Sequence, residues 1–171
     1  AKYLLLENET AVIEIAQACG LHLLTTEERN PLITSSYGVG ELIADALDEG
    51  VKRIIIGLGG SATNDAGFGM LMALGMTFHD SDDNTLAQGG GALANLQRLD
   101  ATNFHTSVLY TVFEVACDVT NPLCGELGAS AIFSPQKGAS PQQVNDLDKA
   151  LTHFASVCEQ HGYQDHQDIA G

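Results

Sequence analysis

Basic residues are scarce in this chain: Lys and Arg together number seven, against 22 Asp and Glu, among 171 residues. The formal net charge of −15 argues against a nucleic-acid partner, because so few cations cannot neutralise a phosphate backbone. The same deficit argues against an anionic membrane surface. It does not exclude a small anionic ligand, since a local group of backbone amides can bind phosphate within an acidic protein.

Cysteine is also sparse, and no two cysteines stand at CxxC spacing: Cys19, Cys117, Cys124 and Cys158. Structural zinc held by cysteines alone is therefore not expected. The first residues, AKYLLLENETAVIEIA, are too charged and too short to cross a bilayer, and they do not resemble a signal peptide. We expect a cytoplasmic protein with reduced thiols and no membrane partner.

Hydrophobic residues make up 44% of the chain and charged residues 17%, which favours a packed core over disorder. Helical and strand patterns alternate, so we expect an α/β fold, a mixed sheet flanked by helices. In the first half the pattern predicts a strand, a helical turn, a helix closed by Gly50, a buried strand and a second helix closed by Gly75. Their ranges are 11–15, 16–20, 37–49, 52–58 and 65–74.

The second half is less regular until its last helix. A short strand from residue 76 leads into a long loop with glycines, and 107–123 begins as a β-rich run and ends in a polar turn. Residues 128–140 are interpreted as a loop around one short strand. The final helix is predicted from its cap at Ser140, with Pro141 at the first helical position and Gln143 completing a capping box, and it ends at Gly162.

A glycine-rich turn follows the buried strand, in the segment RIIIGLGGSATNDAGFG. Strand, glycine turn and helix together make an anion site, because the turn and the first helical turn leave backbone amides without internal partners. This arrangement suits a phosphate or a carboxylate. We therefore expect the binding chemistry of the protein to involve the residues between Gly57 and Asp65.

Three interpretations of this turn compete on spacing alone. A Walker A loop fails, since no Gly-Lys-Ser/Thr follows and no lysine lies between Arg53 and Lys137. A Rossmann dinucleotide fingerprint fits in part: Gly57, Gly59 and Ala62 match its spacing, and acidic residues follow at about the ribose distance. The polar insertion SATND stands where a Rossmann helix is usually apolar. The third interpretation is that the glycines only allow close helix–strand packing.

The acidic segment DSDDNTLAQGGG is tested against a calcium loop and fails. Asp80, Asp82 and Asn84 fit the first ligand positions, but Thr85 takes the glycine position and Gly91 the bidentate glutamate position. A solvated turn is expected there. His161 and His166 bracket GYQD near the end of the chain and are interpreted as surface residues.

The glycine-rich turn GLGGSATNDAGFGMLMALG resembles the signature of the bacterial glycerate kinase family. Other segments resemble the family in the same order: TAVIEIAQACGL, RNPLITSSYGVGELI, GGGAL, VACDVTNPL and SPQKGAS. Together they extend the resemblance over nearly the whole chain. Ala66 and Phe68 depart from it, where the family often has glycine and alanine.

The resemblance implies a fragment. Family members are about twice this length and consist of two α/β domains, the second inserted into the first. Residues 1–171 resemble the inserted domain alone, as a single α/β domain. The Asp-Ser-Phe-Lys and Thr-Gly-Glu-Gly motifs of the first domain do not occur here, and DIAG, at 168–171, resembles the point where that domain resumes.

The resemblance also implies an activity: transfer of the γ-phosphoryl group of ATP to the 2-hydroxyl of D-glycerate, with Mg²⁺, giving 2-phosphoglycerate. The partners implied are D-glycerate, ATP and the remaining domain of the same kinase. The fragment by itself is expected to be inactive. A Rossmann-type dinucleotide-binding module and a non-catalytic interaction domain are the alternatives.

The candidate site residues lie in three segments. Asp65 and Asp118 are the candidate catalytic residues, and Asp118 is also the candidate Mg²⁺ ligand. The candidate substrate- or phosphate-binding residues are Gly59, Gly60, Ser61, Thr63, Asn64, Thr120, Asn121 and Lys137. Asp65 could instead only cap a helix, Lys137 could be a surface residue, and CDVTNPL could be an ordinary Asx-Pro turn. Whether the glycine turn binds ATP phosphates or the glycerate carboxylate stays open.

Overall fold

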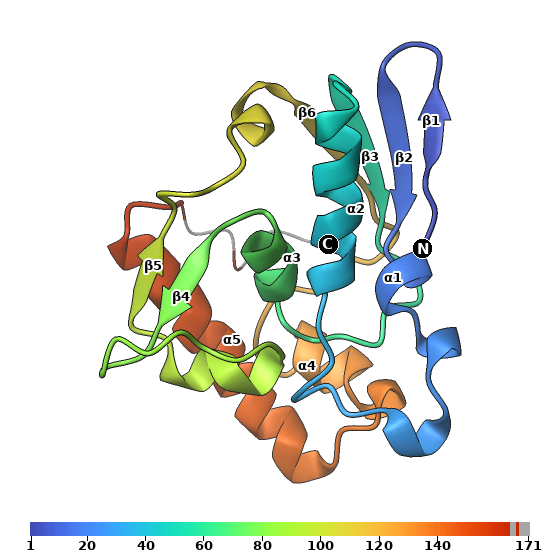
Figure 1. Ribbon diagram of the computed structural model, residues 1–171. Coiled ribbons are helices and arrows are strands. Elements are labelled where there is room, and N and C mark those ends of the chain that lie inside the picture. The colour runs from blue at the N-terminus through green and yellow to red at the C-terminus, as the bar shows by residue number, and fades with distance from the viewer. Residues whose placement is uncertain (165–166, 168–171) are drawn as a thin grey trace.

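A computed structural model describes residues 1–164 and 167 of the chain. His166 and the segment 168–171, whose roles the sequence analysis interprets, lie outside the described residues. Figure 1 shows a sheet region with α2 in front of it, and a second region built around α4, α5 and the small β4–β5 ladder. Within the described part, no helix is long and apolar enough to cross a membrane.

The main sheet has four strands in the order β1-β2-β3-β6. Strands β2, β3 and β6 are parallel, and β1 pairs with β2 in the antiparallel direction, so the sheet is mixed as predicted. Its strands are β1 (Leu4–Leu6), β2 (Thr10–Glu14), β3 (Arg53–Gly57) and β6 (Val112–Ala116).

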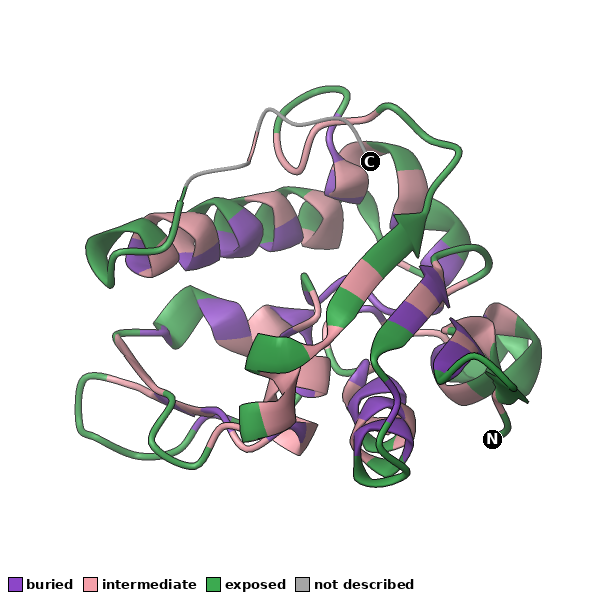
Figure 2. Ribbon diagram, turned by 90° about the horizontal axis from the view of Figure 1, so that it is seen from above, coloured by how far each residue is buried: buried purple, intermediate pink, exposed green. Residues whose placement is uncertain are grey.

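Helix α2 (Tyr37–Asp48) packs on one face of this sheet through its apolar side (Figures 1 and 2). Val39, Ile43 and Leu47 of the helix join Ile13 and Ile54 of the strands in one buried cluster. Gly50, at a φ of 83°, closes the helix, and its amide donates to the carbonyl of Leu47. Glycine has no Cβ and adopts the left-handed conformation without steric strain. The glycine at position 50 therefore predicted this helix end correctly.

The second region has its own buried cluster, in which Phe68 packs edge-on against Phe78 with ring centroids 4.6 Å apart. Helix α5 (Pro141–Gln160) supplies Leu151 and Phe154 to it. The predicted capping box of Ser140 and Gln143 is present. The other elements of this region are α3 (Phe68–Ala73), β4 (Thr77–His79), η3 (Gly90–Asn95), β5 (Arg98–Asp100), α4 (Ala129–Phe133) and η5 (Pro135–Lys137).

The remaining short elements lie between β2 and α2 and between β5 and β6. They are α1 (Ala16–Cys19), η1 (Leu21–Leu23), η2 (Thr26–Glu28) and η4 (Thr106–Tyr110). Between η2 and α2, the predicted Asn-Pro turn is present, with Asn30 Oδ1 accepting from the Leu32 amide at 3.1 Å.

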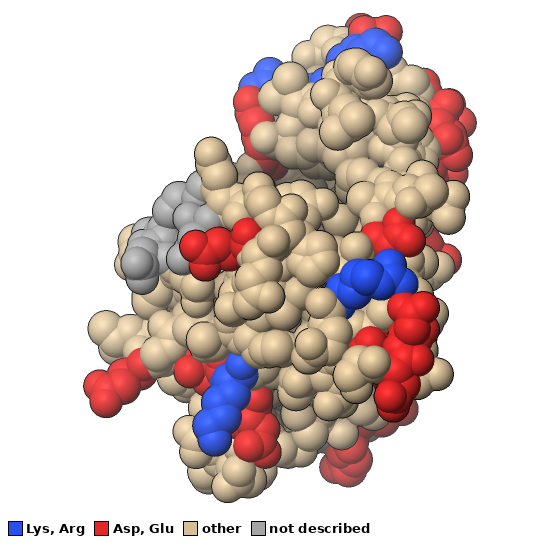
Figure 3. Space-filling model, turned by 90° about the vertical axis from the view of Figure 1, so that its left-hand side faces the viewer, with Lys and Arg blue, Asp and Glu red and all other residues tan. Residues whose placement is uncertain are grey.

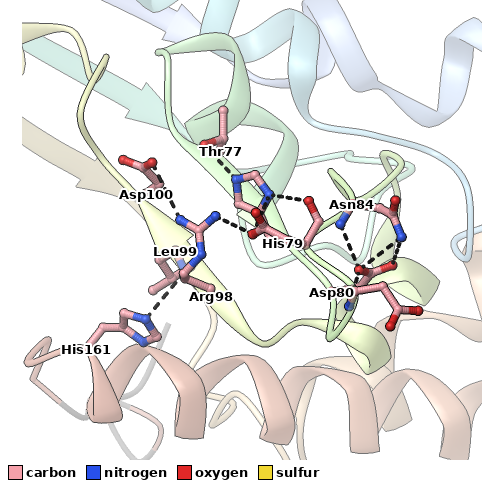
Figure 4. A network of polar contacts seen from close by, with 10 residues as sticks. Thr77, His79, Asp80, Asn84, Arg98, Leu99, Asp100 and His161 are labelled. Atoms are coloured by element: carbon pink, nitrogen blue, oxygen red, sulfur yellow. Dashed lines mark hydrogen bonds and ion pairs between the residues drawn. The ribbon is translucent and has the colours of Figure 1, made fainter.

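The acidic segment after β4 is a solvated turn, as expected (Figure 4). Asp80 Oδ1 accepts from the backbone amides of Asp82 and Asn84, each at 2.9 Å. These bonds keep the pKa of the Asp80 carboxyl below its usual value. Arg98 of β5 reaches across to Asp83 and so ties the turn to the next strand.

The interpretation of residues 128–140 as a loop around a strand is wrong. The segment forms α4 and the 3₁₀ turn η5, and Ser130 and Ser134 of this stretch are buried. The β-branched and aromatic residues of SAIF suggested a strand, but tertiary packing outweighs so weak a local preference. The predicted helix at 65–74 starts only at Phe68, because Gly67 takes a left-handed φ of 72°.

Charged side chains are distributed over the surface in local groups. On the face in Figure 3, the Lys and Arg side chains lie beside Asp and Glu side chains. Arg53 pairs with Glu114, and Arg98 with Asp83 and Asp100. These basic groups are thus matched locally by acidic ones.

Candidate active site

Two turns meet at the carboxyl ends of neighbouring parallel strands. Gly57, the last residue of β3, pairs with Ala116, the last residue of β6. The amide of Leu58 continues the ladder by donating to the Ala116 carbonyl at 3.3 Å. The glycine-rich turn and the Asp118 turn therefore start side by side, at the edge of the sheet where α/β proteins bind their ligands.

A pocket of about 260 Å³ lies between these two turns. It contains five of the ten predicted site residues, Gly59, Gly60, Ser61, Asp118 and Lys137. The other lining residues are Leu58, Cys117, Val119, Phe133 and Gln136. Sequence reasoning missed Phe133 and Gln136, which lie in the α4–η5 segment that it mistook for a loop around a strand.

Lys137 is the cation of this pocket, and it is buried. Its Nζ donates to the Ser61 hydroxyl oxygen at 3.0 Å and to the Thr63 carbonyl at 2.6 Å. An ammonium group has three N–H donors, so one remains for a ligand. Burial lowers the pKa of Lys137, and the neighbouring Asp65 carboxylate opposes that shift. The alternative that Lys137 is a surface residue is wrong.

The position of Lys137 depends on close backbone packing after η5. Gly138 has a φ of 96°, and a Cβ built on it would lie 2.3 Å from the Arg29 carbonyl oxygen. Only glycine fits so near another backbone in this conformation. The segment before α2 thus packs directly against the end of η5.

The glycine-rich turn adds backbone donors to the pocket. Across the described residues, no backbone hydrogen bond uses the amides of Gly59, Gly60 or Ser61 as donors. Gly60 has a φ of 74°, and a Cβ on Gly59 would meet open space. The turn therefore presents unpaired amides beside an ammonium group, which is the chemistry of an anion site.

Asp118 lies two residues beyond β6, where its side chain is exposed at the edge of the pocket. Among the described residues, no group of three or more His, Cys, Asp or Glu side chains is placed to hold a metal. A single carboxylate still fits Mg²⁺, which commonly uses one or two carboxylates, with water and substrate phosphates as its other ligands. Asp118 lines the same pocket as the anion-binding groups, so its carboxylate could bind a Mg²⁺ that also binds the phosphates of a substrate.

Asp65 lies away from the pocket lining and is 2% exposed. Its Oδ2 accepts from the Ser36 amide at 2.9 Å, the Ser36 hydroxyl at 2.8 Å and the Gly69 amide at 3.2 Å. These bonds join the starts of α2 and α3. They support the capping role that the sequence left open, and a direct catalytic role for Asp65 stays a prediction.

Three of the four remaining predicted residues have structural contacts. Asn64 is buried and donates from Nδ2 to Ser130 Oγ at 2.9 Å, which links the turn to α4. Asn121 donates from Nδ2 to the Leu127 carbonyl at 2.8 Å and lines a neighbouring, mostly apolar cavity of about 420 Å³. Thr63 contributes its carbonyl to Lys137, and Thr120 is exposed beyond Asp118. None of these four lines the Lys137 pocket.

Comparison with known proteins decides the family. The model of the family described as "Glycerate kinase family" matches residues 1–171, the whole of the chain. The chain belongs to the glycerate kinase family. The resemblance drawn from the sequence motifs is thereby confirmed, and the match does not favour the dinucleotide-module alternative.

Glycerate kinases of known sequence are similar over nearly all of this chain. The glycerate kinase of Haemophilus influenzae is 54% identical over 165 residues, which are 96% of this chain and 44% of the relative. The glycerate 2-kinase of Escherichia coli is 48% identical over 96% of this chain and 43% of its own length. A crystal structure from Salmonella typhimurium LT2, assigned as glycerate kinase 2, superposes with a TM-score of 0.96 at 48% identity. The superposition covers 99% of this chain and 46% of the Salmonella chain.

This member of the glycerate kinase family thus spans less than half the length of the relatives it matches. The α/β fold with a mixed sheet is confirmed by the structure and by the Salmonella neighbour. The assignment of residues 1–171 to one inserted domain stays a prediction.

Proposed function

We propose that the full-length protein is a glycerate kinase that transfers the γ-phosphoryl group of ATP to the 2-hydroxyl of D-glycerate, giving 2-phosphoglycerate and ADP. Family membership over the whole chain supports this activity. The observation that carries the placement of the site is the contact of buried Lys137 with Ser61 and Thr63 beside unpaired amides. Residues 1–171 would form one wall of the site, and the remaining domain the other.

Lys137 and the glycine-rich turn would bind an anionic group of a substrate. The ammonium group and the amides of Gly59 and Gly60 are donors fixed in place before the ligand arrives. Ser61 accepts from Lys137 and so keeps its own proton for a ligand oxygen. Phosphoryl transfer depends mainly on positioning and on neutralised charge, and fixed donors in a partly buried pocket provide both.

Asp118 would hold Mg²⁺ together with the phosphates of ATP. A bound Mg²⁺ would neutralise charge on the transferred phosphoryl group. The alternative use of Asp118 is to accept a hydrogen bond from a glycerate hydroxyl, which orients that hydroxyl or takes its proton. In both cases Asp118 acts at the edge of the pocket, where it stays accessible to a substrate that is bound to the remaining domain.

The test is the activity of the full-length protein. ADP release would be followed with D-glycerate, L-glycerate and Mg-ATP, and the phosphorylated carbon would be identified by ³¹P–¹H NMR. We expect turnover with D-glycerate, dependence on Mg²⁺ and 2-phosphoglycerate as the product. Transfer to the 3-hydroxyl, or equal turnover of L-glycerate, would contradict the proposal.

A kinetic comparison would show which anionic group the glycine-rich turn binds. If it binds the glycerate carboxylate, Lys137→Met raises the KM for glycerate more than the KM for ATP. If it binds the ATP phosphates, the order is reversed. In each case the loss of a donor that acts in the transition state also lowers kcat.

A further inference from the structure

One face of the four-stranded sheet is open to solvent. Strand register places alternate residues of all four strands on this face, and among them only Thr10 is buried. At its two edges, Leu4 and Val112 are 58% and 57% exposed. An apolar line nevertheless crosses β1, β2 and β3 on this face, where Leu4, Val12 and Ile55 are in register, and Leu6 and Val112 add apolar side chains one pair further along β1 and β6.

The topology of the chain explains why this face is uncovered. Strands β2, β3 and β6 are parallel and lie side by side in chain order. Right-handed crossovers between strands that advance in one direction all lie on the same face of a sheet. Helix α2 makes the first crossover, and the second passes Phe104 and Val108, which pack against the same cluster as α2. Both crossovers therefore cover the α2 face and leave the other without a layer.

An uncovered parallel sheet is unusual, because parallel sheets are normally buried under helices on both faces. The run Ile54–Ile56 has the continuous apolar character of a strand covered on both sides. More than half of the length of each relative described above lies outside the region that this chain matches. We propose that a helix from the part of the same polypeptide outside residues 1–171 covers the open face.

The charges on the face define the chemistry of that helix. Arg53 and Glu114 form an ion pair on the open face, with side chains 47% and 45% exposed. A covering helix would bury the apolar line with an apolar stripe of its own. Beside the ion pair it would need a polar or small residue, since a buried pair left without further hydrogen bonds is costly.

Thiol accessibility in the full-length protein tests the proposal. Val112→Cys and, as a control, Ile33→Cys would be labelled with a maleimide, and the label would be located by peptide mass spectrometry. Ile33 is 66% exposed and lies in the turn before α2, remote in sequence from every strand. Each native rate would be divided by the rate of the same variant in urea, which removes differences in intrinsic reactivity.

We expect the thiol of Val112→Cys to react about 100-fold more slowly in the native protein than in urea, because labelling of a covered residue requires local opening. The thiol of Ile33→Cys should react at similar rates in both. Equal native and unfolded rates for Val112→Cys would show that the face stays open, and would overturn the proposal.

A second experiment identifies the occupant. A photo-crosslinking amino acid at position 112 would be irradiated in a mixture of isotope-labelled and unlabelled full-length protein. An intramolecular cross-link to a peptide outside residues 1–171 supports the proposal. A cross-link between two molecules, or protection that disappears on dilution, would show a second copy instead and contradict it. Neither readout uses glycerate phosphorylation, so both results stand if the proposed activity fails.

Discussion

The ammonium nitrogen of Lys137 lies 2.6 Å from the backbone carbonyl oxygen of Thr63, although 74 positions separate the two residues in the sequence. This contact brings the only buried lysine of the described chain to the glycine-rich turn, in the pocket that Asp118 also lines.

Replacement of Lys137 by methionine should impair catalysis far more than folding. Methionine keeps much of the side-chain length but loses the charge, and we expect kcat/KM of the full-length protein to fall about 100-fold or more. The exposed Lys149→Met is the matched control and should keep the parental rate. A Lys137→Met variant with a near-parental kcat/KM and a normal melting curve would remove Lys137 from the site.

The activity should depend on the protonation of Lys137. Burial lowers the pKa of this lysine below its usual 10.5, so the charged form that binds an anion is lost as the pH rises through the lowered value. We expect the KM for the anionic substrate to increase with pH below 10.5. Lys137→Arg should remain charged over that range and flatten the profile. A parental profile that is unchanged in Lys137→Arg would exclude this lysine as the titrating group.

Asp118→Asn should keep the fold and lose rate, because the two side chains have nearly the same shape and Asp118 is exposed. We expect kcat/KM to decrease about 100-fold, or roughly 2.7 kcal/mol of transition-state stabilisation. Asp82→Asn, an exposed change in the turn after β4, serves as the control. If Asp118→Asn retained the parental rate, Asp118 would be an ordinary turn residue.

Asp65 should matter first for stability. Asp65→Ala leaves the Ser36 amide, the Ser36 hydroxyl and the Gly69 amide without their acceptor in a buried place. We expect the free energy of unfolding to fall by about 3 kcal/mol or more. Asp65→Asn keeps an acceptor oxygen and should cost less. The exposed Glu159→Ala should change the urea midpoint little, and a similarly small change in Asp65→Ala would refute the capping role.

The 171-residue chain by itself should not phosphorylate D-glycerate. It contains the Lys137 pocket but spans less than half the length of its relatives, and phosphoryl transfer needs groups on both sides of the substrate. A coupled ADP-release assay checks this. Turnover near that of typical enzymes, on the order of 10 per second, would contradict the prediction.

Strongly periodic or capped elements were predictable because their signals are local. The capping box of Ser140 and Gln143 and the left-handed glycines at Gly50 and Gly162 act within a few residues, and α2 and α5 end as the pattern predicts. Strand β1 was missed because its three residues, LLL, do not show the alternation of apolar and polar residues that predicts a strand. Strand β5, also three residues, exists through pairing with β4 and lies in a segment without a strand pattern.

The candidate site was predictable in part. Gly59, Gly60, Ser61 and Asp118 follow the carboxyl ends of two strands, and a strand–turn pattern is visible in the sequence. Asp65 and Asn64 belong to the same motif, yet their side chains turn into the protein to bind Ser36 and Ser130. Motif spacing does not specify the direction of a side chain, because that depends on which neighbours offer hydrogen bonds.

The order of residues along the chain alone accounts for the α/β class, the ends of α2 and α5 and the family of this protein, since each depends on local backbone chemistry or on motifs read in order. Tertiary structure alone brings Lys137 to Ser61 and Thr63 and buries its ammonium group. It also leaves one face of the sheet open, because the direction of the crossovers sets which face is covered. Contacts between distant segments depend on the packing of the whole chain, and no local pattern records them.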